Sequence, residues 1–185
     1  MSGKENTGKI LYLLRHGIAL STNTDGDKAR TLAPKGKDDV VALGKIMKDK
    51  GYTPDHALCS PASRTKQTLD GLCASLTIDH IQYPENMYNG SAGDLLHHIQ
   101  NIDDNENAAL LVAHIPGIQE LARLLTGSGP SSLVQRLNTG FSPGMMAVIS
   151  CACENWKDIR PGENELTDIL DPQDYNAPAR PTRWM

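Results

Sequence analysis

Two histidines of this chain lie at the ends of short apolar runs. Residues 9–14 form an almost continuously apolar segment, typical of a buried strand, and Arg15 and His16 follow it at once. Residues 108–113 form a second such run, which leads directly into His114. Residues at the carboxyl ends of strands in an open α/β sheet face the crevice in which ligands bind. We therefore expect Arg15, His16 and His114 to face one ligand site.

A second arginine is expected at the same site from a different element. Ser60 and Pro61 predict the start of a helix, because serine is a favourable N-cap and proline is tolerated at the first helical position. Arg64 then falls in the first turn of that helix. Helix N-termini carry free N–H groups and the positive end of the helix dipole, which favour bound anions. Since the net charge is −4, an anionic substrate would depend on such local arginines.

This combination of imidazole and guanidinium groups suits phosphoryl transfer. A neutral imidazole is a competent nucleophile near neutral pH, so we expect His16 to attack a phosphoryl group and form a phosphohistidine. The planar guanidinium groups of Arg15 and Arg64 match the phosphoryl oxygens with paired hydrogen bonds. His114, protonated beside the phosphate, adds further donors. We expect no cofactor and no metal, because this chemistry requires neither and no cluster of carboxylates indicates a metal site.

In this order the motifs resemble the signature of the histidine phosphatase superfamily, also called phosphoglycerate mutase-like. Residues 15–17 match its Arg-His-Gly strand end, residues 60–68 match its Ser-Pro-x-x-Arg-Thr-x-Gln-Thr segment, and His114 matches its late histidine. The small size and the His-x-Pro-Gly turn at residues 114–117 look most similar to the SixA-type phosphohistidine phosphatases. The resemblance covers the chain from about residue 9 to residue 172.

The resemblance implies roles for individual residues. His16 is then the phosphorylated nucleophile, and Arg15, Arg64 and His114 form the phosphate pocket. Larger relatives use an acidic residue to protonate the leaving oxygen, and the corresponding segment makes Glu85 a candidate acid. SixA-type members manage without a strong acid, because phosphohistidine already has a good leaving group. If Glu85 points away from the site, phosphoramidates become better substrates than alkyl phosphoesters.

Several functions are compatible with these residues. The leading hypothesis is a metal-independent phosphatase of the SixA type that acts through phosphohistidine, with a phosphorelay protein carrying phosphohistidine as its substrate. A close alternative is the hydrolysis of small phosphorylated metabolites by the same residues. Mutase action fits less well, since the chain lacks the long insertions expected to enclose a sugar phosphate. A phosphate-binding protein without turnover is a further alternative, against which the intact set of four residues argues.

The alternation of strands and helices predicts an α/β fold of three layers, with a mostly parallel central sheet flanked by helices. Further strands are expected at residues 56–59, 81–83 and 145–151, with residues 155–159 pairing as an edge hairpin and residues 127–132 as a loop. The length of 185 residues predicts one domain over residues 1–185. Residues 1–8 are read as a polar extension and residues 171–185 as a proline-containing tail, draped on the surface or frayed.

The composition is that of an ordinary globular protein, with 39% hydrophobic and 22% charged residues. No basic cluster indicates nucleic-acid binding, no apolar run reaches membrane-spanning length, and the polar start does not resemble a signal peptide. These features predict a cytoplasmic protein with no nucleic-acid or membrane partner, and they leave the oligomeric state open. Buried, reduced thiols are expected at Cys59, Cys73, Cys151 and Cys153. Solvated side chains are expected at His56, His80, His97 and His98.

Overall fold

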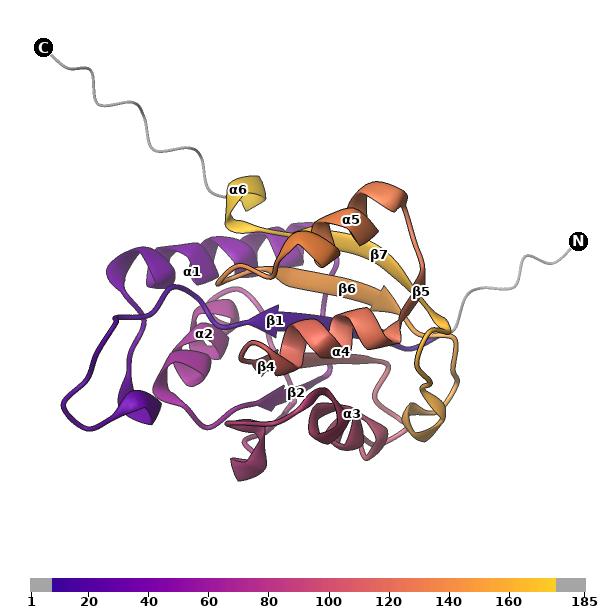
Figure 1. Cartoon of the computed structure of the whole chain (residues 1–185), viewed down its shortest axis with the longest axis horizontal. Helices are drawn as coiled ribbons and strands as arrows, with labels where there is room; N and C mark the ends of the chain where they lie inside the picture. Colours follow the sequence, from indigo (N-terminus) through magenta and orange to yellow (C-terminus); the bar gives the residue numbers. More distant parts are fainter. Residues whose placement is uncertain (1–7, 176–185) are drawn as a thin grey trace, which may run out of the picture.

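The computed structural model describes residues 8–175 and contains one seven-stranded sheet in the order β3-β2-β4-β1-β6-β7-β5 (Figure 1). The strands are β1 (Ile10–Arg15), β2 (His56–Cys59), β3 (His80–Gln82), β4 (Ala108–Ala113), β5 (Thr126–Ser128), β6 (Met146–Ser150) and β7 (Asn164–Leu170). The α-helices are α1 (Pro34–Asp49), α2 (Ser63–Cys73), α3 (Ala92–Gln100), α4 (Gly117–Leu125), α5 (Ser131–Thr139) and α6 (Pro172–Tyr175). Short 3₁₀ helices are η1 (Asp27–Ala29), η2 (Glu85–Met87) and η3 (Trp156–Asp158).

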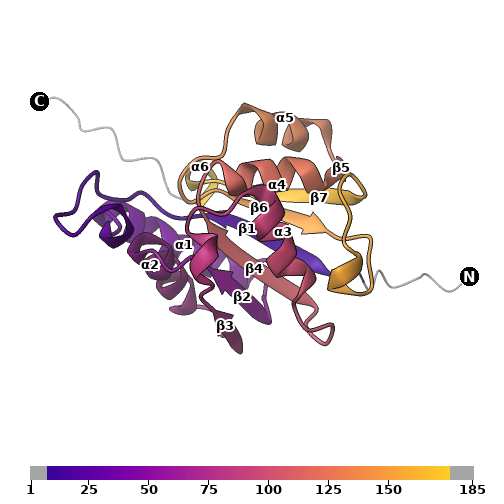
Figure 2. The same cartoon turned by 60° about the horizontal axis from the view of Figure 1, so that its bottom comes forward.

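The sheet lies between two layers of helices, and the alternation of β1 side chains creates both cores. Leu11 and Leu13 join the apolar cluster under α3, α4 and α5, whereas Tyr12 and Leu14 join the cluster under α1 and α2. Figure 2 shows α1 and α2 on one side of the sheet and α3, α4 and α5 on the other. A strand covered on both faces must be apolar throughout, which is why this run of sequence is so uniform.

The two central strands bring the ends of distant segments together. β1 pairs in parallel with β4, in a register that sets Arg15 opposite Ala113, the residue before His114. β2 pairs in parallel with the other side of β4, and β3 with β2. On its far side β1 pairs antiparallel with β6, which in turn pairs antiparallel with β7. The parallel half of the sheet therefore delivers the strand ends that carry the predicted site.

Several local predictions were wrong. The helix that follows β2 begins at Ser63 with Ala62 as its N-cap, so Ser60 does not cap it, although Arg64 does lie in its first turn. Residues 127–132 are not only a loop, because they contribute to β5 and to the start of α5. Residues 155–159 form η3 rather than a strand, and the antiparallel partner of β6 is β7.

Two side chains have an environment opposite to the predicted one. Cys73 is exposed at the end of α2, although Cys59 and Cys151 are buried and all four thiols are free. His56 is buried at 5% exposure instead of solvated. In the predicted tail, α6 packs back onto the domain, where the Tyr175 hydroxyl donates to the Gly144 carbonyl at 2.8 Å. The rest of that tail, residues 176–185, and residues 1–7 of the N-terminal extension lie outside the described residues.

Within residues 8–175, no helix is both long enough and apolar enough to cross a membrane.

Candidate active site

His16 directly follows β1 and is almost fully buried, with 8% exposure. Its backbone N–H donates to the Ala113 carbonyl, so the end of β1 is fixed beside the end of β4. Its ring Nδ1 lies 2.7 Å from the Gly17 carbonyl oxygen. Because a carbonyl oxygen can only accept, Nδ1 carries the proton in this contact and Nε2 keeps its lone pair. The ring is thereby set up with one free nitrogen, as a nucleophile requires.

The Ser-Pro-x-x-Arg-Thr-x-Gln-Thr segment holds the surroundings of His16 in place. The Thr68 hydroxyl accepts the Gly17 N–H at 3.0 Å, so α2 fixes the backbone immediately after His16. Gln67 accepts the backbone N–H of Leu32 at 2.7 Å, which fastens the loop that follows β1. The Thr65 hydroxyl donates to the carbonyls of Ser60 and Ala62 at the turn into α2. These polar positions of the motif are therefore structural supports.

His114 follows β4 and lies beside His16. The two imidazole rings have centroids 5.3 Å apart. His114 Nε2 is hydrogen-bonded to the Ser60 hydroxyl at 2.7 Å, and the Ser60 backbone N–H donates to the carbonyl of Val112 in β4. Ser60 therefore orients His114. From the sequence alone, the proline that follows Ser60 had indicated a helix N-cap instead.

The two arginines reach the same region from β1 and α2. Arg15 donates through Nη1 to the Phe141 carbonyl at 2.8 Å. Arg64, with 6% exposure, donates through Nη1 to the Asp27 carbonyl at 2.7 Å and through Nη2 to the Asp27 carboxylate at 3.1 Å. These bonds hold the guanidinium groups in place while other donors of the same groups stay free.

Unpaired donors are concentrated at this site. Arg15 Nε, Arg64 Nε and His114 Nδ1 are buried and have no hydrogen-bond partner among the described residues. A buried polar nitrogen without a partner costs roughly 1–3 kcal/mol, so native proteins keep such groups where they serve a purpose. These three nitrogens come from three different elements around one buried ring. A tetrahedral oxyanion offers acceptors to the two arginine N–H groups, and to His114 Nδ1 in the tautomer whose Nε2 accepts from the Ser60 hydroxyl.

The electrostatics of the site favour an anion. Burial lowers the pKa of His16 to about 4; the Gly17 hydrogen bond opposes this shift, and the charges of Arg64, Arg15 and Arg30 add to it. Burial, Arg64 and His16 lower the pKa of His114 to about 3. Burial and the charge of Arg64 also lower the pKa of Arg15. Both rings are therefore neutral at pH 7 in the absence of an anion, and protonation of His114 would require a bound anion beside it.

Glu85 stands apart from these four residues. It lies in η2 with 77% of its side chain exposed, and its carboxylate pairs with Lys28 at 2.6 Å. Arg64 bonds instead to the carboxylate of Asp27, which also accepts from the Tyr88 hydroxyl. Hydrogen bonds from Tyr88, Arg30 and Arg64 hold the pKa of Asp27 well below its usual range. Asp27 is therefore ionised at neutral pH and has no proton to give to a leaving group.

Two cavities open beside the site and share Ile115. One, of about 660 Å³, is lined by Arg15, Phe141 and Arg136 among others. The other, of about 530 Å³, is lined by Arg64, His114, Tyr88 and Glu120 among others.

The segment of Tyr88 reaches this position because Gly117, the first residue of α4, lies against the Gly90 backbone. A Cβ at Gly117 would lie only 2.3 Å from the Gly90 carbonyl oxygen.

Comparison with known proteins identifies the class that this fold and site define. The family model of the histidine phosphatase superfamily (branch 1) matches residues 11–95, which include Arg15, His16 and Arg64. An uncharacterized protein of Mycobacterium tuberculosis is 31% identical over 152 residues, covering 80% of this chain and 93% of that protein. This chain belongs to the histidine phosphatase superfamily.

Among the solved structures that this chain resembles are two assigned as phosphohistidine phosphatases of the SixA type. A protein assigned as the phosphohistidine phosphatase SixA of Nakamurella multipartitia superposes with a TM-score of 0.76 at 26% identity, covering 89% of this chain and 96% of that one. The SixA assigned in Agrobacterium tumefaciens gives a TM-score of 0.74 at 26% identity, covering 89% and 99%. The predicted family and the predicted α/β fold class are thus confirmed.

Proposed function

We propose that this protein is a phosphohistidine phosphatase of the SixA type, acting on phosphohistidine carried by a protein such as a phosphorelay component. The observation that carries the proposal is the set of three buried, unpaired nitrogens, from Arg15, Arg64 and His114, on residues that lie near the His16 ring. The similarity to two SixA structures supports the same conclusion.

The reaction has two displacements at phosphorus. His16 Nε2 donates its lone pair to the phosphorus atom, a nitrogen–phosphorus bond forms, and the bond to the substrate imidazole breaks. The departing imidazole leaves as a neutral group when its other nitrogen carries a proton. Water then attacks the phosphorylated His16, its oxygen–phosphorus bond replaces the bond to Nε2, and inorganic phosphate leaves. Arg15 and Arg64 neutralise the phosphoryl oxygens in both steps, and His114 adds a donor as the anion raises its pKa.

Neither Glu85 nor Asp27 is placed to protonate a leaving group, which favours a substrate whose leaving group is already good. Glu85 is exposed and paired with Lys28, and Asp27 is held ionised. An alkyl phosphoester would release an alkoxide unless a proton were supplied, whereas a phosphohistidine releases an imidazole. Phosphoramidates are therefore better matched to the site than alkyl phosphoesters.

The charges around the two cavities favour a substrate whose phosphoryl group is its main anionic group. Outside the proposed phosphate pocket, the cation among the lining residues is Arg136, which is already paired with Asp174 at 2.6 Å. The linings also include the carboxylates of Asp27, Glu120 and Asp171. A small metabolite with further carboxylate or phosphate groups would meet carboxylates here. A phosphorylated histidine side chain brings no such extra charge.

The proposal is tested by trapping the intermediate. Incubation with a radiolabelled phosphodonor followed by a rapid quench should give an enzyme label that is acid-labile and stable to base. His16→Ala should abolish the label and lower turnover by roughly 10³-fold or more. His97→Ala, which changes an exposed histidine of α3, should retain both. A label that survives in His16→Ala would contradict the assignment of the nucleophile.

Substrate preference is tested on the same preparation. The kcat/KM for phosphoramidate and for a histidine-phosphorylated phosphorelay domain should exceed that for alkyl phosphates by at least two orders of magnitude. An aryl phosphate, with its better leaving group, should fall between them. Equal or greater activity on alkyl phosphates would reject the phosphohistidine assignment and favour a phosphomonoesterase. If no phosphodonor were hydrolysed, the protein would be a phosphate-binding protein without turnover.

A further inference from the structure

A second group of chemically active side chains lies at the opposite end of the sheet. His56 is the first residue of β2, His80 is the first residue of β3, and Glu106 precedes β4 by two positions. The parallel register of β2 and β3 pairs His56 directly with His80. Because these residues stand at the beginnings of the strands, they are separated by the length of the sheet from the phosphate pocket at the strand ends.

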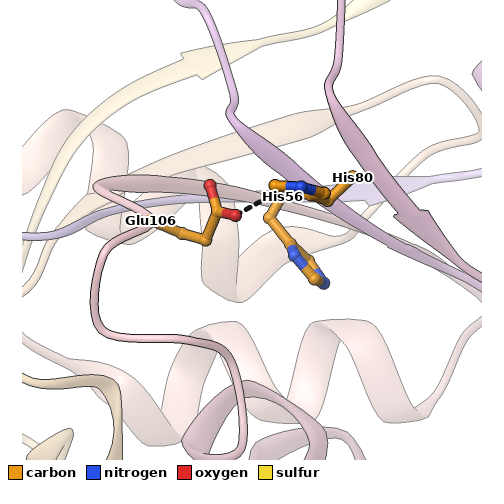
Figure 3. A group of neighbouring side chains, drawn as sticks. All are labelled: His56, His80 and Glu106. Carbon is orange, nitrogen blue, oxygen red and sulfur yellow. Dashed lines mark hydrogen bonds and ion pairs between the residues drawn. The ribbon is translucent and has the colours of Figure 1, made fainter.

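The side chains converge closely enough to share one ion. Each offers one ligand atom, and these three atoms lie within 4.8 Å of one another. The Glu106 carboxylate accepts a hydrogen bond from His80 Nδ1, and the His56 ring lies beside them (Figure 3). The centroids of the two imidazole rings are 6.3 Å apart.

His56 carries the observation that points to a ligand. Its side chain is buried, with 5% exposure, and its Nε2 has no hydrogen-bond partner within residues 8–175. Among the described residues, the other buried side-chain nitrogens in this condition are those of the phosphate pocket. A structural histidine in a core is normally satisfied by backbone or a neighbouring side chain. An ordinary ion pair between His80 and Glu106 leaves His56 unexplained.

We propose that His56, His80 and Glu106 form a binding site for a divalent transition-metal ion, with Zn²⁺ as the best match. Two imidazoles and one carboxylate, with a fourth position open to water, are a common ligand set for zinc. Zinc holds such ligands at about 2.0–2.2 Å, so the three atoms would have to draw together by small side-chain rotations. His80 has 64% of its side chain exposed, which gives an ion access from solvent.

The bound ion would tie together three segments. β3 is an edge strand of three residues whose side chains are all exposed, so few apolar contacts hold it. A metal bridging β3, β2 and the segment before β4 would fasten this edge. The site is therefore assigned a structural role, independent of turnover at the phosphate pocket.

Metal binding is tested directly on the full chain, first stripped with a chelator and then titrated calorimetrically with Zn²⁺ alone. One equivalent should bind, and the thermal midpoint should rise. His80→Ala and Glu106→Gln should each weaken binding at least tenfold, and both change partly exposed groups that the fold tolerates. His97→Ala should bind zinc as the unmodified chain does. The proposal would be overturned if the unmodified chain did not bind Zn²⁺ stoichiometrically, or if His80→Ala and Glu106→Gln bound it as tightly as the unmodified chain.

Cobalt distinguishes this site from one built on cysteine. Co²⁺ held by imidazole and carboxylate should show d–d absorption without a thiolate charge-transfer band. A strong thiolate band would place the ion on cysteines such as Cys151 or Cys153 and refute the assignment. His80→Ala should hydrolyse phosphoramidate at the rate of the unmodified chain, because the proposed role is structural. Loss of hydrolysis in that variant would contradict an independent structural site.

Discussion

At the scale of single residues, the decisive contact is the one between His16 Nδ1 and its neighbour's carbonyl. It fixes the ring tautomer and directs the free Nε2 away from the backbone. Burial and two arginines keep that nitrogen unprotonated well below neutral pH. The proposed nucleophile is therefore neutral throughout the physiological range and needs no separate base to deprotonate it.

The ring chemistry gives a measurable pH dependence. Nitrogen-detected NMR of the free protein should show His16 as the Nδ1–H tautomer and place its pKa near 4 rather than near 6.5. Because both His16 and His114 bind protons less well folded than unfolded, the stability they contribute is complete above pH 6.5. It declines as the pH falls toward about 4 for His16 and about 3 for His114, by at most roughly 3 and 5 kcal/mol respectively. Titration of His16 near pH 6.5 would contradict this account.

The four residues of the proposed site could be predicted from the sequence, because each one stands next to a strong local signal. Arg15, His16 and His114 follow apolar runs, and Arg64 lies at the start of a helix. The positioning contacts could not be predicted in the same way. Asp27 meets Arg64 only because a loop folds across α2, and such contacts have no periodic signature.

At the scale of elements, the site depends on close backbone contacts between segments. Gly117 at the start of α4 brings the turn at Gly90 against the helix, and this turn carries Tyr88 to the edge of His114. The Tyr88 and His114 rings meet edge to face at 5.6 Å. A glycine at that helix position has no advantage in helix propensity, so packing explains it.

Gly117→Ala tests this contact. Alanine normally stabilises a helix relative to glycine by about 0.5–1 kcal/mol, but here its Cβ would collide with backbone. We expect a loss of about 1–3 kcal/mol in the free energy of unfolding and a fall in kcat/KM. The matched change Gly93→Ala in α3, where a Cβ would meet only the Ser91 hydroxyl at 3.7 Å, should be neutral or stabilising. Chemical denaturation measures the free energy of unfolding of both variants. Equal changes in Gly117→Ala and Gly93→Ala would show that the contact between Gly117 and Gly90 is unimportant.

The elements themselves were predictable where their pattern is local. β2 and β4 were predicted with their observed bounds, β4 from its apolar run. α5 was not predicted. The predicted start of α2 lay too early, because a serine followed by a proline also fits a helix N-terminus. The true function of Ser60 depends on its bond to His114, which is 54 residues away.

At the scale of the whole molecule, the proposed anion would connect β1, α2 and the segment after β4. Inorganic phosphate at 100 times its dissociation constant should therefore stabilise the fold by about 2.7 kcal/mol. For a chain of this size that corresponds to a rise of roughly 5–10 °C in the thermal midpoint. Arg64→Ala should lose most of the rise, and Arg123→Ala, which changes an exposed arginine of α4, should keep it. A rise that sodium chloride reproduces at equal ionic strength would exclude specific binding.

The placement of β6 beside β1 has a consequence for any attempt to isolate a minimal phosphatase. The Gly144 backbone N–H donates to the carbonyls of both Arg15 and His16, and the Phe141 carbonyl receives the Arg15 guanidinium. All four proposed catalytic positions occur before residue 115, yet these two partners of the end of β1 come from the last third of the chain. A fragment ending ahead of residue 141 would retain all four side chains and lose the partners that hold Arg15 and the backbone of His16. A fusion or truncation would therefore have to keep β1 together with the segment that contains Phe141 and Gly144.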